Sequence, residues 1–208
     1  MTQLKLWGQP KSINVQKVLW ALDELGLKYE RIDAGGSFGR VKDADYLSRN
    51  PNGLIPTLEV DGAPLWESNA ILRYLFNQHG TAPIQPSDSI QRARADQWTE
   101  WYGSSYWPNT RVLLVQLVRT PEAQRDKNVI AAARAQVLDA ARILEAHLEK
   151  QPFVAGDQFT WGDIPVGAAA HRFLNLSFDR PALKATEAWY KRLQARAPYK
   201  KWIDLPLV

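Results

Sequence analysis

Cysteine is absent from all 208 residues of this chain. Its absence excludes disulfide bonds, thiolate metal sites and a cysteine nucleophile. Histidine occurs only three times, as His79, His147 and His171, and these positions have no metal-ligand spacing. We therefore expect no bound metal.

The chain also lacks a long apolar run. The longest stretch, residues 112–118, is interrupted by Gln116 and is too short to cross a bilayer. The first eight residues hold too few apolar side chains for a signal peptide. The net charge is +4, and the basic residues occur singly, without an arginine-rich arm. We expect a cytoplasmic protein that binds neither membrane nor nucleic acid.

The first part of the chain alternates strand and helix signals. Strands are predicted at 4–7, 29–32, 57–60 and 64–66, and helices at 12–25, 42–48 and 68–78. Asp61-Gly62 is a strong hairpin signal between the third and fourth strands. The order is βαβ followed by ββα, which predicts a thioredoxin-like α/β domain over residues 1–80.

The second part of the chain has no strand signal. A proline-rich segment at 81–87 is typical of a linker. Beyond it, helices are predicted at 88–118, disturbed near Gly103 and Pro108, then at 121–150, from 160 onward and at 186–196. The sequence therefore predicts an all-helical domain over residues 88–208.

Two short runs carry most of the chemical information. The first, residues 50–56 (Asn-Pro-Asn-Gly-Leu-Ile-Pro), indicates a turn leading to an extended X-Pro edge. The second, residues 67–71 (Glu-Ser-Asn-Ala-Ile), indicates an acidic helix start that can receive an anion. Each run alone also fits an ordinary turn or helix cap.

The spacing of these two runs, together with Ser12-x-Asn14-x-x-Lys17-Val18, resembles the cytosolic glutathione transferases over nearly the whole chain. Among their branches, the resemblance is to the bacterial serine-type members or a related group. It implies that glutathione binds as co-substrate through Glu67, Ser68, Leu54 and Ile55, with Pro56 in a cis peptide bond. The central residue of glutathione then pairs with the Ile55 backbone.

The resemblance also implies a donor for the glutathione sulfur. Ser12 is the first candidate and Asn14 the second, although either side chain also suits a helix start. The chain has no cysteine for the cysteine-type mechanism, and Trp7 stands near the position of the tyrosine in tyrosine-type members. Arg40 and Lys42 are candidates for binding the glycyl carboxylate of glutathione, with Lys11 as a further possibility.

An aromatic segment is the candidate wall of the second-substrate pocket. Its proposed pocket residues are Trp101, Ser105, Tyr106, Trp107 and Asn109. The alternative is an aromatic core or a dimer face. Arg111 is a candidate for binding an anionic leaving group.

Thr160 and Asp163 are interpreted as a structural cap that opens a buried helix. The resemblance as a whole implies a homodimer that conjugates the glutathione thiolate to small apolar electrophiles, without metal or nucleotide. A glutathione-dependent disulfide reductase or peroxidase is the second hypothesis. A non-catalytic binding module of the same fold is the third.

Overall fold

The computed structural model describes residues 2–208. The first part of the chain forms a four-stranded sheet. The strands are β1 (Leu4–Trp7), β2 (Glu30–Ile32), β3 (Thr57–Val60) and β4 (Ala63–Trp66), in the spatial order β2-β1-β3-β4. β1 pairs parallel with β2 and antiparallel with β3, and β3 pairs antiparallel with β4. Asp61 and Gly62 both have positive φ, as the turn of a tight hairpin requires. All four predicted strands are confirmed.

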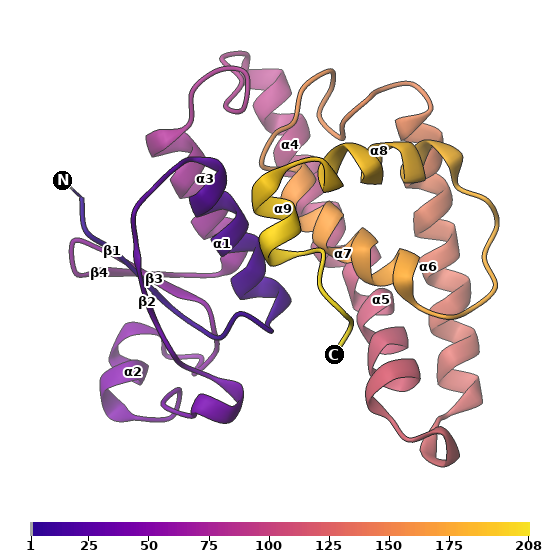
Figure 1. Ribbon diagram of the computed structural model, residues 1–208, viewed down its shortest axis with the longest axis horizontal. Coiled ribbons are helices and arrows are strands. Elements are labelled where there is room, and N and C mark those ends of the chain that lie inside the picture. The colour runs from indigo at the N-terminus through magenta and orange to yellow at the C-terminus, as the bar shows by residue number, and fades with distance from the viewer. Residues whose placement is uncertain (1) are drawn as a thin grey trace.

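Helices cover both faces of this sheet. On one face, α1 (Ile13–Glu24) and α3 (Ser68–His79) pack side by side, as Figure 1 shows. On the other face lie α2 (Ala44–Arg49) and a short 3-10 turn, η1 (Gly36–Phe38), over a small cluster of Trp7, Ala34 and Tyr46. The βαβ-ββα order is therefore the thioredoxin-like arrangement that the sequence predicts.

The remainder of the chain is helical. Its elements are α4 (Ser89–Trp101), η2 (Tyr102–Tyr106), α5 (Trp107–Leu114), η3 (Val115–Arg119), η4 (Glu122–Gln124), α6 (Lys127–Leu148), α7 (Asp163–Asn175), α8 (Lys184–Gln194) and α9 (Ala197–Trp202). η2 and η3 are single π-helical stretches, so the helix from 89 to 119 is continuous but changes its pitch twice. Pro108 lies at the start of α5, directly after the π-helical stretch η2.

Two helix predictions need correction. The helix expected from residue 121 begins only at Lys127, because the carboxylate of Asp126 accepts hydrogen bonds from the N–H groups of Asn128 and Val129. Residues 122–124 form a separate 3-10 turn. The final helix, α9, was not predicted from the sequence; its short span of six residues gives little periodic signal.

One apolar core runs through both parts of the chain. Trp20 on α1 is fully buried, and its ring lies 5.7 Å from Phe159 and 5.1 Å from Tyr199 of the helical part. A Cβ on Gly167 of α7 would lie 2.6 Å from Cδ1 of Leu193 and 3.4 Å from Trp20, so α7 packs closely against α8 and α1 here. α1 therefore belongs to the core of both parts, and Ser12 lies at its N-terminus.

The Thr160–Asp163 pair opens α7 from a buried position. The carboxylate of Asp163 accepts hydrogen bonds from the Thr160 N–H at 2.9 Å, the Val154 N–H at 3.0 Å and the Trp189 indole N–H at 2.9 Å. Burial raises the pKa of Asp163 to about 6. These contacts give the pair the structural character that the sequence suggested.

Candidate active site

Three segments meet at one end of the sheet. In the register, Trp7 at the end of β1 and Trp66 at the end of β4 both pair with Thr57 at the start of β3. The loop to Ser12, the Ile55–Pro56 edge and the Glu67–Ser68 helix start therefore leave the sheet side by side. The two sequence runs and the start of α1 are brought together by strand pairing.

Ser12 is the N-cap residue of α1, but its hydroxyl does not cap the helix. Its backbone is extended, and no side-chain capping hydrogen bond is formed. The Asn14 side chain, two residues further on, also has no hydrogen-bond partner within residues 2–208. Both donors therefore remain available to a ligand at the positive end of the helix.

The 50–54 turn fixes the Ile55–Pro56 edge. The carbonyl oxygen of Leu54 accepts hydrogen bonds from the Tyr46 hydroxyl at 2.5 Å and from the Asn50 amide at 2.9 Å. The Ile55–Pro56 bond is cis, as expected. Among the described residues, no hydrogen bond uses the N–H or the C=O of Ile55, which leaves one rung of backbone unpaired.

Glu67 and Ser68 open α3 with an unusual backbone. Glu67 has φ +68°, a left-handed value that is uncommon outside glycine, and its side chain is exposed. Its carboxylate forms no ion pair or hydrogen bond within residues 2–208, and the hydroxyl of Ser68 has no partner there either. The site thus presents an unneutralised carboxylate beside the free N–H groups of a helix start.

A buried lysine lies behind this helix start. The Lys17 ammonium donates to Asn69 Oδ1 at 2.8 Å and lies 4.5 Å from the centre of the Tyr102 ring. Burial lowers the pKa of Lys17 to about 7, against the opposing influence of Glu67. The lysine joins α1, α3 and the helical part around one side of the site.

Ser12 opens onto a cavity of about 610 Å³ between the two parts of the chain. The lining residues are Gln9, Lys11, Ser12, Ile13, Asn14, Gln16, Gly36, Leu54, Ile55, Trp107, Arg111, Leu114, Arg119, His171, Arg172, Ile203, Leu205, Pro206, Leu207 and Val208. The first nine come from the thioredoxin-like part and the rest from the helical part. The cavity is therefore an interdomain cleft with the candidate donors on one wall.

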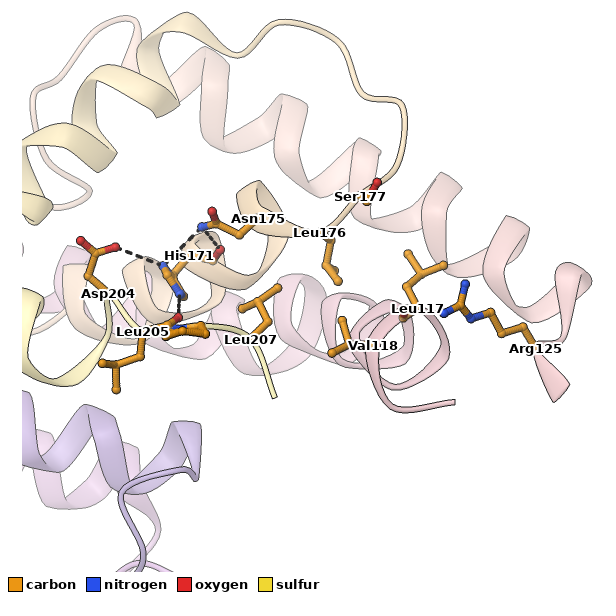
Figure 2. Close-up of a pocket in the computed structure, with 11 residues that line it drawn as sticks. Leu117, Val118, Arg125, His171, Asn175, Leu176, Ser177, Asp204, Leu205 and Leu207 are labelled. Atoms are coloured by element: carbon orange, nitrogen blue, oxygen red, sulfur yellow. Dashed lines mark hydrogen bonds and ion pairs between the residues drawn. The ribbon is translucent and has the colours of Figure 1, made fainter. Parts of the chain in front are cut away.

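A second cavity, of about 600 Å³, shares His171, Leu205, Pro206 and Leu207 with the first (Figure 2). The His171 imidazole contacts the Tyr190 hydroxyl and the Leu205 carbonyl oxygen, each at 2.8 Å. Burial lowers the pKa of His171. Its two ring nitrogens are engaged with α8 and the final segment, and none of the predicted glutathione contacts lines this second cavity.

Comparison with known proteins agrees with the geometry. Residues 2–77 match the family model for the glutathione S-transferase N-terminal domain, and residues 127–192 match that for its C-terminal domain. Glutathione S-transferase GstB of Escherichia coli K12 is 37% identical over 206 residues, covering 98% of this chain and 99% of the relative.

The chain belongs to the glutathione S-transferase family.

Other relatives extend this assignment. Glutathione S-transferase 3 of Zea mays is 31% identical over 98% of this chain and 94% of its own length. A crystal structure of the theta class glutathione S-transferase from Xanthomonas axonopodis pv. citri with glutathione bound superposes with a TM-score of 0.93 at 39% identity, covering all of both chains. The chain is thus a transferase with the complete two-domain architecture of this family.

The aromatic segment of this transferase is arranged differently from the sequence expectation. Trp107 lines the Ser12 cavity, but Trp101, Ser105, Tyr106 and Asn109 are not among its lining residues. Tyr106 is fully buried, and its ring stacks 5.2 Å from that of Trp101. Most of the segment therefore packs as an aromatic core, and of the five expected pocket residues only Trp107 lines this cavity.

The π-helical turn accounts for the orientation of the side chains that follow it. The predicted pocket face assumes a regular helix of 3.6 residues per turn from Trp98 onward. The turn at Tyr102–Tyr106 accommodates one extra residue, so every later side chain is rotated by about 100° from that count. Trp107, Arg111 and Leu114 consequently share the face that looks into the cavity. The sequence signal that could have identified this face is their i, i+4, i+7 spacing.

The two cations expected near the glycyl carboxylate lie outside the cavity lining. The Arg40 guanidinium lies 4.9 Å from the centre of the Trp7 ring, on the side of the sheet that α2 covers. Lys42 is exposed beside the 50–53 turn, close to Gly53. Lys11, which the sequence gave as a further possibility, is in the lining. Sequence reasoning missed Arg119 and Arg172 altogether.

Within residues 2–208, no group of three or more His, Asp or Glu side chains is arranged to hold a metal ion. None of the helices in the described part of the chain is long and apolar enough to cross a membrane.

Proposed function

We propose that this transferase binds glutathione across the end of the sheet and directs its thiolate into the Ser12 cavity. The observation that carries the proposal is that Ser12 and Ile55, which come from separate segments, line the same cleft with unused polar groups. The reaction is attack by the thiolate on an electrophilic carbon of a small second substrate. The carbon–sulfur bond forms as the leaving group departs with its electron pair.

The amino-acid end of the γ-glutamyl group binds at Glu67 and Ser68. The Glu67 carboxylate has no cation partner of its own within the described chain and suits the ammonium of the ligand. The Ser68 hydroxyl and the first N–H groups of α3 suit the carboxylate. An acid beside a helix start thus provides one contact for each charge of a zwitterion.

The cysteinyl residue of glutathione pairs with the backbone of Ile55. An unpaired N–H and C=O next to β3 can accept a short extended peptide as one added strand rung. Lys42 stays a candidate for the glycyl carboxylate because it lies beside the same turn. Lys11 is the alternative within the cavity, and Arg40 is the weaker candidate because its guanidinium stacks on Trp7.

The thiolate is stabilised at the N-terminus of α1. A free thiol has a pKa of about 8.5, so two units of depression require roughly 2.7 kcal/mol of preference for the anion. One or two directed hydrogen bonds and a helix end can supply this amount. Ser12 is our first choice as donor because its hydroxyl is not used by the helix, and Asn14 is the second.

The helical part supplies the second-substrate side of the cleft. Trp107 and Leu114 provide apolar surface there, beside Leu205 and Leu207 of the final segment. Pairing of two copies into a homodimer, as the family resemblance implies, stays a prediction. Among residues 2–208, the large apolar side chains that are exposed include Leu54, at 64% exposure on the turn beside the site.

Glutathione binding by calorimetry tests the proposal. Glu67→Gln should lose roughly tenfold or more in affinity, because the ligand ammonium loses its charged partner. Glu149→Gln, at the residue that follows α6, removes the same charge at an exposed position outside the cleft and should bind like the wild type. A wild-type chain that does not bind glutathione, or a Glu67→Gln variant that binds it normally, would contradict the proposed placement.

A further inference from the structure

The charged side chains that line the Ser12 cavity are all cationic. Its lining contains four residues with cationic side chains, Lys11, Arg111, Arg119 and Arg172, besides His171. No aspartate or glutamate is among its lining residues. A cleft lined by one sign of charge concentrates ligands of the other sign and strengthens their binding.

The three arginines belong to the second-substrate side of the cleft. Arg111 lies on α5, Arg119 on η3 and Arg172 on α7, whereas every proposed glutathione contact lies in the thioredoxin-like part. Arg111 comes one helical turn after Trp107, so the two side chains share a face. The positive charge therefore lies opposite Ser12, where an electrophile would enter.

None of these arginines forms an ion pair with an aspartate or glutamate in residues 2–208. Six other arginines of the chain, Arg31, Arg49, Arg73, Arg134, Arg142 and Arg196, form ion pairs with Asp or Glu. Arg119 instead donates twice to the main-chain oxygen of Val208, which as the last residue carries the terminal carboxylate, and Arg111 is exposed without an ion pair. Two arginines without an anionic partner, Arg111 and Arg172, thus line the cavity.

Arg172 is the most informative of the three. It is only 8% exposed, and its guanidinium donates to the Ala168 carbonyl and to the Gln16 side-chain oxygen, both neutral acceptors. Burial lowers its pKa to about 10, which leaves the group charged at neutral pH. A buried cation without an internal anion is costly unless a ligand supplies the negative charge.

We propose that the second substrate is an electrophile bearing a carboxylate, which the arginines of the helical part bind while its reactive carbon faces the thiolate. The inference rests on the proposed function and specifies its substrate class. Guanidinium groups match the planar geometry of a carboxylate and can bind both of its oxygens. The carboxylate itself takes no part in the bond changes; it orients the electrophile.

Two matched ligands test the charge preference without turnover. S-(4-carboxybenzyl)glutathione and S-(4-carbamoylbenzyl)glutathione differ only in a carboxylate against a neutral amide of similar size. Calorimetry on the wild type should show the carboxylate form binding about tenfold tighter, with a preference that weakens as salt is added. Arg111→Gln should remove most of this preference. Arg142→Gln, an exposed arginine of α6, should retain it.

Turnover provides a second readout. In 4-chloro-3-nitrobenzoate, the thiolate forms a carbon–sulfur bond at the carbon that loses chloride with its electron pair. The thiol proton passes to solvent. The value of kcat/KM, divided by the uncatalysed rate, should be about tenfold higher for the benzoate than for 4-chloro-3-nitrobenzamide. Arg119→Gln serves as an independent variant if Arg111→Gln fails to fold.

The outcomes separate the two levels of the proposal. If the wild type binds both ligands and turns over both substrates without preference, the carboxylate inference is overturned and the glutathione function stands. If Arg111→Gln weakens both ligands equally, the arginine binds glutathione itself, and the inference is again overturned. If neither ligand binds and neither substrate reacts, the proposed function fails.

Discussion

The Lys17 ammonium on α1 donates a 2.8 Å hydrogen bond to the side-chain oxygen of Asn69 on α3. The same ammonium faces the Tyr102 ring, and the nearby charges that act on it are those of Glu67 and Arg172. This one contact links the first helix, the Glu67–Ser68 helix start and the helical part. It also places a titratable group at the edge of the proposed glutathione site.

Lys17 predicts a measurable pH dependence of stability. Its pKa is about 10.5 when the chain is unfolded and about 7 in the folded protein, so between these values the unfolded chain binds more protons. The unfolding free energy contributed by Lys17 therefore rises with pH across this range. Relative to Lys17→Met, the wild type should gain about 2 kcal/mol between pH 7 and pH 9 in urea unfolding. Parallel curves for the two proteins would show that Lys17 does not titrate there.

Ser12 predicts a change in turnover without a change in binding. Ser12→Ala should lower kcat for an aryl electrophile by about tenfold or more and move the midpoint of the pH–rate profile upward. Glutathione affinity should change little because the Glu67 and Ile55 contacts remain. If Asn14→Ala produces this shift and Ser12→Ala does not, asparagine is the donor. If neither does, the thiolate is held mainly by backbone N–H groups.

Trp107 and Tyr106 should behave oppositely although they are adjacent. Trp107 lines the cavity, so Trp107→Ala should raise KM for an aryl electrophile several-fold and leave that for glutathione unchanged. The Tyr106 hydroxyl is buried without a hydrogen-bond partner among the described residues. Tyr106→Phe should therefore keep wild-type kinetics with an equal or higher unfolding free energy. Loss of activity in Tyr106→Phe at full stability would return Tyr106 to the site.

The close packing around Gly162 predicts a loss of stability when a side chain is added there. A Cβ at this position would lie 2.8 Å from the Ala95 carbonyl oxygen and 2.9 Å from the Ala95 Cα, both on the backbone of α4. Gly162→Ala should therefore lower the unfolding free energy by about 1–3 kcal/mol.

Gly103 is the matched control for this change. It lies in helical backbone at η2, and an added Cβ would meet nothing within 4 Å. Gly103→Ala should be neutral or stabilising by up to about 1 kcal/mol. Both variants are compared by urea unfolding, and equal effects at the two positions would contradict the close approach of α7 to α4.

Local sequence signals predicted all four strands and most of the helices, together with the two runs that the structure brings to one end of the sheet. Asp61-Gly62 predicts its hairpin because few residues tolerate positive φ at two successive positions. Thr160 and Asp163 are three residues apart, so a helix start brings them together whatever the rest of the chain does. The sequence also determined that residues 50–56 and 67–71 flank a hairpin, and strand register then makes them neighbours.

The second-substrate wall was decided only by the tertiary structure. Whether Tyr106 or Trp107 faces the cleft depends on one extra residue in a π-helical turn, and a helical count that begins before this turn does not include that residue. Arg172 meets Gln16 across 156 positions of the chain, and no local pattern specifies that contact. Local propensity acts over a few residues, whereas the charge and shape of this cleft arise from side chains that only packing of the two parts brings together.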